Sequence, residues 1–156
     1  MAADVAEYAL AALKATSAVT DLVIGGADGI FESGDCTANS LATAEITRRD
    51  GGNPAKILGM VVQDAGEKAL DAQRTEQRVA VWFYDRQRGY TNIRAAREQV
   101  YLALQSKSTA LTSPLDDRTA VITIEMESRT GHRHEHSFEV DFELMTFVAT
   151  VHLDLG

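Results

Sequence analysis

The 156-residue sequence is poor in cysteine and proline, with one Cys and two Pro. The single cysteine, Cys36, excludes an intrachain disulfide framework and any metal site built from several cysteines. It also agrees with a reducing compartment. No run of about 18 apolar residues occurs, so we expect no segment that spans a membrane.

Common catalytic and cofactor motifs are missing as well. The sequence contains no GxGxxG, GxxxxGK[ST], HExxH, GxSxG or CxxC. A catalytic role for Cys36 would need a histidine and an orienting partner, which the sequence does not place, so we interpret it as a loop cysteine. These absences predict a protein that is not an enzyme and holds no cofactor.

Positive charge is scarce. The net charge is −8, the pI is about 4.9, and no Lys/Arg cluster is longer than Arg48-Arg49. Proteins that grip DNA phosphates carry a basic surface, so we expect no tight nucleic-acid binding. The length and the 45% apolar content predict a single domain over 1–156 with a sizeable core.

Helical periodicity opens the chain. Apolar residues three and four apart predict a helix over 3–15, and Ser17 resembles the N-cap of a short second helix. Gly25-Gly26 should end that helix, because glycine adopts the left-handed conformation at helix ends. A short strand is expected over 29–32.

A Gly-, Ser-, Thr-, Asn- and Asp-rich stretch covers 33–54. It predicts a long loop insertion, with at most a helical turn over 41–46, and its role is either contact with a neighbouring chain or plain disorder. The apolar run 57–63 predicts a strand. A polar connection, partly helical, should follow over 64–76.

The clearest strand covers 77–85, where both alternating faces are apolar. This pattern predicts a central strand covered on both sides. Thr91 or Asn92 should cap the main helix, which runs to about Lys107 with a buried apolar stripe. A loop containing Pro114 is expected over 108–117.

Two strands with alternating polarity end the chain, over 120–127 and 138–144, joined by 128–135. They predict an antiparallel pair. After Leu144 the apolar positions change phase, which requires a bulge or bend near Leu144-Met145, or burial of the opposite face beyond it. The fold class is therefore α+β: a mixed, mostly antiparallel sheet with one main helix packed on it and a helical N-terminus.

Three alternating histidines, His132, His134 and His136, are candidate metal ligands, because an extended strand would project them to one side. The alternative is a polar hairpin tip, and Arg129 and Arg133 crowd the segment with positive charge. We favour the hairpin tip.

Five carboxylates occupy the polar positions of the two C-terminal strands, and we expect them on one face: Glu125, Glu127, Glu139, Asp141 and Glu143. Clustered like charges are unfavourable across strands. The cluster is either a solvated face or the lining of a channel, whose negative wall would let DNA slide through without binding. Divalent-ion binding is a third, weaker alternative.

The order of these elements resembles the tail-terminator (tail-completion) family of long-tailed phages. The resemblance rests on the helix–turn–strand unit ALKATSAVTDLVIGGADGIFES, on QRVAVWFYDRQRGYTNIRAAREQVYLAL, and on the C-terminal hairpin AVITIEMESRTGHRHEHSFEVDFELMTFVATVHL. It covers nearly the whole chain except 33–54. The long Gly-rich stretch and the HxHxH tip depart from the family.

The resemblance implies a structural virion protein at the head–tail junction, assembled in the host cytoplasm. Copies would form a ring, commonly a hexamer, that terminates the tail tube and meets the head connector or neck protein, with DNA passing through its lumen. The alternatives are a head-closure or neck ring protein, a metal-dependent enzyme using the three histidines, and a small-ligand binding domain. The segments 33–54, 64–76 and 128–136 are the expected partner contacts.

Overall fold

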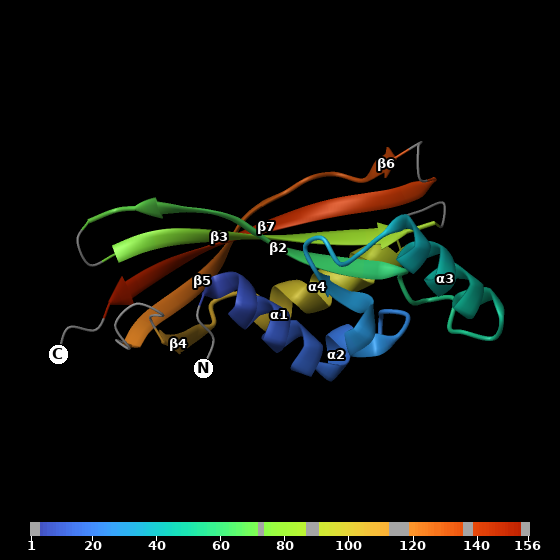
Figure 1. The fold of residues 1–156 in the computed structure, drawn as a ribbon, viewed down its shortest axis with the longest axis horizontal. Coiled ribbons are helices and arrows are strands. Elements are labelled where there is room, and N and C mark those ends of the chain that lie inside the picture. Colours follow the sequence, from blue (N-terminus) through green and yellow to red (C-terminus); the bar gives the residue numbers. More distant parts are fainter. Residues whose placement is uncertain (1–3, 72–73, 87–90, 113–118, 136–138, 154–156) are drawn as a thin grey trace.

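A computed structural model describes residues 4–71, 74–86, 91–112, 119–135 and 139–153. Within these ranges the chain forms one seven-stranded sheet in the order β1-β2-β3-β7-β5-β4, with β6 pairing with β7 (Figure 1). The strands are β1 (Ile30–Glu32), β2 (Gly59–Ala69), β3 (Arg74–Asp85), β4 (Ser108–Thr112), β5 (Thr119–Arg129), β6 (Arg133–Glu135) and β7 (Val140–Leu153). Only β1 and β2 pair in parallel among them, so the predicted α+β class is confirmed.

Helices α1, α2 and α4 lie together on one side of the sheet, and α3 lies at one end (Figure 1). Their bounds are α1 (Val5–Ala15), α2 (Ser17–Thr20), α3 (Ala38–Arg49) and α4 (Thr91–Leu104), with a 3-10 turn η1 (Gly26–Gly29) before β1. Among the described residues, none of these helices has the length and apolar character needed to cross a bilayer.

The N-terminal unit follows its sequence signals. The Asp4 carboxylate accepts a hydrogen bond from the Glu7 backbone N–H and so caps α1. Val5, Ala9 and Leu13, four residues apart, are almost fully buried against the sheet. The predicted first helix and short strand are thus confirmed, although Ser17 is the first residue of α2 and not its cap.

Strand β3 is the centre of the sheet, as its two-sided apolar pattern predicts. It pairs with β2 along one edge and with β7 along the other. Val79, Val81 and Phe83 point into the core beneath α1 and α4. Trp82 and Tyr84 point to the opposite side, called the open face below, and are partly exposed.

The prediction of a loop over 33–54 is wrong, because the segment contains α3. Thr37 and Ser40 form a reciprocal capping box at its start. Leu41 is the one fully apolar residue that the helix buries, so its sequence shows little helical periodicity. Arg48 is buried too, and this polar anchor holds the end of α3.

Two further predicted connections are strands. The segment 64–76 continues β2 to Ala69 and starts β3 at Arg74, forming a hairpin with a register shift between Asp64 and Glu67. The described part of 108–117 is β4, which pairs with β5, and Pro114 lies outside the described residues. Polar composition concealed both elements, because backbone hydrogen bonds to a neighbouring strand form regardless of side-chain polarity.

Strand β7 explains the change of phase at Leu144. Along its edge with β3 the strand pairs without a register shift, so no bulge interrupts it there. Along its other edge, the register shift falls in β5, between Met126 and Ser128. Met145 and Phe147 lie in the core, and Glu143 shares their side of the sheet. The second predicted explanation therefore holds: β7 buries one continuous face, whose composition changes from acidic to apolar along the strand.

Candidate assembly surface

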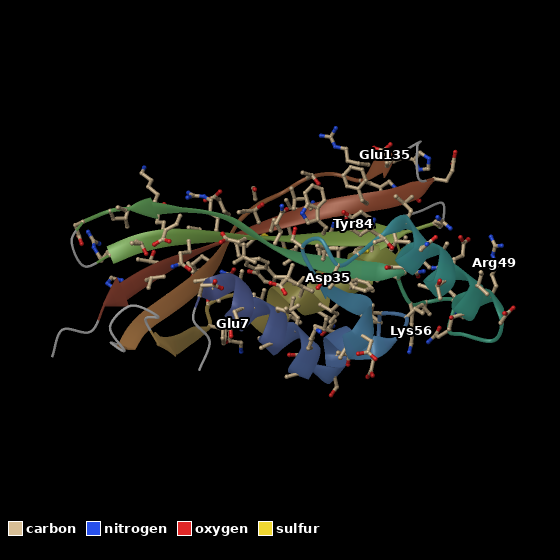
Figure 2. The ribbon with its side chains drawn as sticks, viewed as in Figure 1. Glu7, Asp35, Arg49, Lys56, Tyr84 and Glu135 are labelled. Atoms are coloured by element: carbon tan, nitrogen blue, oxygen red, sulfur yellow. The ribbon has the colours of Figure 1, made fainter. Side chains whose placement is uncertain are left out.

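The open face of the sheet carries a hollow of about 460 Å³. Its floor is formed by Val61 and Gln63 on β2, Trp82 and Tyr84 on β3, and Val140 and Phe142 on β7. The walls come from residues 33–38, Leu41 and Glu135. Figure 2 shows Tyr84 between the segment that carries Asp35 and the strand that carries Glu135.

The aromatic floor of this hollow is held in place by its neighbours. The Trp82 indole N–H donates to Gln63 Oε1 over 3.0 Å, which satisfies the polar end of the ring. The Phe142 ring lies 5.9 Å from that of Trp82 and 6.4 Å from that of Tyr84, centroid to centroid. The floor is therefore a fixed, mostly apolar surface.

Two titratable groups in the hollow, Cys36 and Tyr84, favour their neutral forms. Burial raises the pKa of the Cys36 thiol and also the pKa of the Tyr84 hydroxyl. A thiol with a raised pKa is a poor nucleophile near neutral pH, because the thiolate is the reactive species. The hollow is thus suited to receive an apolar group and does not activate Cys36. The sequence did not reveal that Cys36 lies in such a hollow.

Helix α3 is tied to the sheet by a buried ion pair. Arg48 Nη1 lies 2.5 Å from Asp85 Oδ1, and the two side chains are 8% and 2% exposed. Arg48 also donates to the Lys56 carbonyl, while Asn92 donates to Asp85 and to the Pro54 carbonyl. This network joins α3, the 50–58 segment, the end of β3 and the start of α4. Asn92, expected as a possible helix cap, is the second residue of α4, and its side chain takes part in this network.

The predicted carboxylate face is not a single face. Asp141 and Glu143 lie on the core side of β7 and are 9% and 3% exposed, whereas Glu125, Glu127 and Glu139 are exposed. Arg97 Nη1 donates to both oxygens of Glu143 over 3.0 Å, and Arg129 lies 3.7 Å away. Their buried ion pairs make Asp141 and Glu143 unsuitable as the lining of an open channel.

The histidine segment surrounds Asp141. His134 Nδ1 lies 2.8 Å and His132 Nε2 3.4 Å from Asp141 Oδ1, and His136 lies outside the described residues. Among the described residues, no group of three or more His, Cys, Asp or Glu is arranged to hold a metal ion. The contacts instead fasten β6 to the start of β7.

Of the three segments predicted to contact partners, 33–54 forms one wall of the hollow and 128–136 contributes Glu135 to another. The 64–76 segment is the β2–β3 hairpin, whose Leu70 is 39% exposed. The aromatic floor was visible in the sequence as a two-sided strand. The walls of the hollow could not be predicted from the sequence, because they come from segments that are distant in the chain.

Comparison with solved structures finds chains that share this fold. A chain from a structure described as the virion of a native gene transfer agent particle matches this fold with a TM-score of 0.55 and 12% sequence identity. The match covers 92% of this chain and 91% of that chain. No protein-family model matches the sequence, and a search of curated proteins finds no match. The likeness therefore establishes a shared fold over nearly the whole length of both chains.

Replacing Asp85 with alanine should lower the free energy of unfolding by about 3–5 kcal/mol, because the Arg48 guanidinium would remain buried without its carboxylate. Urea denaturation measures the change. The matched control is Asp71→Ala, which removes the exposed pair with Arg74 and should cost about 1 kcal/mol or less. Equal losses in the two variants would contradict the anchoring role of the buried pair.

The contact between His134 and Asp141 should make the attachment of β6 to β7 depend on pH. The hydrogen bond to Asp141 raises the pKa of His134 above its ordinary value of about 6.5. The protonated form is thus favoured in the folded chain, and its stabilising contribution is complete below about pH 6.5 and lost as the pH rises through the raised pKa. An NMR titration of the His134 ring should show this pKa, and Asp141→Asn should return it toward the ordinary value. An unshifted pKa in the unmodified protein would contradict the contact.

Proposed function

We propose that this protein is a structural subunit of a phage-like virion, and that its copies assemble into a ring, commonly a hexamer, at the end of the tail tube. The observation that carries the proposal is the likeness to a chain of a gene transfer agent virion over 92% of the sequence. It agrees with the tail-terminator resemblance of the element order. The role is mechanical: binding to other virion proteins, with no catalysis.

The surface of the subunit supports an assembly role. The open face exposes parts of Trp82, Tyr84, Phe142 and Leu144, and exposed apolar surfaces of this kind are typical of protein contacts. Closed rotational symmetry can cover such surfaces on every copy without producing open-ended fibres. In this proposal the ring meets the tail tube on one side and the head connector on the other.

The lumen of the ring would carry DNA. Its proposed lining is reduced to the exposed members of the carboxylate group, Glu125, Glu127 and Glu139. Glu127 also forms an ion pair with Arg78 over 2.9 Å, and its side chain is 38% exposed. A negative wall repels phosphates and so leaves the polymer free to slide.

The ring and its position can be tested with purified components. Sedimentation and negative-stain imaging should show a closed oligomer that binds one end of preformed tail tubes and stops their growth. A strictly monomeric protein that leaves tube length unchanged would overturn the proposal. Cross-linking to portal or adaptor subunits in place of tail-tube subunits would favour the alternative, a head-closure or neck ring.

For the lumen, the double change Glu127→Lys with Glu139→Lys should leave ring assembly intact but lower DNA delivery by assembled particles at least severalfold, because phosphates would bind to the wall. The control is Asp50→Lys, an exposed reversal at the end of α3. Particle counts and delivery assays separate assembly from passage. Unchanged delivery by particles that carry the double variant would remove the lumen assignment.

A further inference from the structure

A second hollow, of about 340 Å³, lies between α4 and β5. Its lining contains Arg94 and Arg97 from the first half of α4, Glu98 and Tyr101 from the second half, and Met126, Arg129 and Met145 from the sheet. We call this surface the α4–β5 groove. Met145 at its base belongs to the core, and none of the residues proposed for the lumen lines it.

The composition of the α4–β5 groove is that of a protein interface. Tyr101, Leu102 and Met126, which lie in or beside it, are 36%, 58% and 39% exposed. Two further exposed large apolar side chains of the described residues, Ile46 and Leu70, lie on separate elements. Tyr, Met and Arg are enriched in interfaces, and an apolar centre with a charged rim is the usual arrangement.

The groove is basic although the chain is acidic. Residues 86–107 contain five basic residues and one acidic residue, in a chain of net charge −8. Glu143 beneath the groove is already occupied by Arg97, whereas the Arg94 side chain is exposed and the Arg129 side chain is 43% exposed. The groove therefore favours an occupant that carries carboxylates.

The same chain supplies such an occupant in its N-terminal unit. Residues 1–35 contain six acidic residues and one lysine, and all six acidic side chains are exposed: Asp4, Glu7, Asp21, Asp28, Glu32 and Asp35. Among the described residues, this unit contrasts in charge with the surface of α4.

The two surfaces lie on opposite flanks of one helical layer. Helix α1 contacts β1, β2 and η1 toward one edge of the sheet, whereas α4 contacts β5 and β7 toward the other. Figure 1 shows α1 and α2 beside α4 on the same side of the sheet. The groove lies between α4 and β5, whereas Asp21 and Asp28 lie at the end of α2 and in η1, so the acidic flank of one copy can meet the basic flank of the next in a head-to-tail contact.

We infer that the N-terminal unit of one copy docks through Asp21 and Asp28 into the α4–β5 groove of its neighbour, and that this contact closes the ring. The inference rests on the proposed function, and it names the surface that joins the subunits. Leu102 and Met126 supply the apolar part of the contact, and the arginines select the acidic flank and fix the direction around the ring.

Charge reversal with complementation tests the inference. Variant A carries Arg94→Glu with Arg129→Glu, and variant B carries Asp21→Arg with Asp28→Arg. Each alone should shift the oligomer to monomer in sedimentation, because like charges would then face one another. An equimolar mixture should restore the oligomer, since in an alternating ring every contact is again between opposite charges.

Two controls accompany the reversals. Arg49→Glu changes the same charge at a side chain that is 73% exposed on α3, and the oligomer should persist. Leu102→Ser leaves the charges intact and should weaken association at least tenfold, while circular dichroism shows the folded spectrum. Association of the unmodified chain should also weaken as salt is raised.

The outcomes separate the two proposals. An oligomer that forms but is unaffected by A, by B and by Leu102→Ser would overturn this interface and leave the ring intact. A chain that forms no oligomer, alone or on tail tubes, would overturn the ring itself. Loss of the oligomer in both variants without recovery on mixing would show that charge pairing between these two flanks is not what joins the copies.

Discussion

The structure depends on a single strand that is bonded along both edges and apolar on both sides. β3 pairs with β2 and β7 over most of its length, so its backbone groups are satisfied within the sheet. Its side chains then divide alternately between two environments. Phe83 anchors the core beneath the helices, and Trp82 and Tyr84 form the floor of the open face. One strand thus contributes both to the core and to the aromatic floor of the open face.

Much of this arrangement could be predicted from the sequence, because the governing signals are local. The helical periodicity of 5–13 and the two-sided pattern of 77–85 reflect side chains that bury on their own element. The fold class follows from their order. The same order resembles that of the phage tail-terminator family, and the likeness to a chain of a gene transfer agent virion agrees with it at the level of the fold.

The wrong predictions for α3 and Glu143 have a common physical cause. Both are held by polar contacts with residues that are distant in the sequence. α3 buries Leu41 and Arg48, and the partner of Arg48 lies 37 residues further along the chain. Glu143 looked like a solvated carboxylate because the sequence does not reveal that Arg97 lies above it. A charged residue is expected outside unless it is paired, and the pairing is a property of the fold. The hollow on the open face was missed for the same reason, since its walls come from α3 and β6.

The polar edge of β2 has a consequence for the free chain. β1 covers β2 at Met60–Val62, and beyond this the strand continues through a register shift at 64–67 and the charged residues Glu67 and Lys68. Irregularity and charge on an exposed edge are devices that prevent strand-by-strand addition of further molecules. In the proposed assembly, the free chain would thus be kept by this edge from joining other copies strand to strand. Its association is left to side-chain surfaces that recognise one geometry.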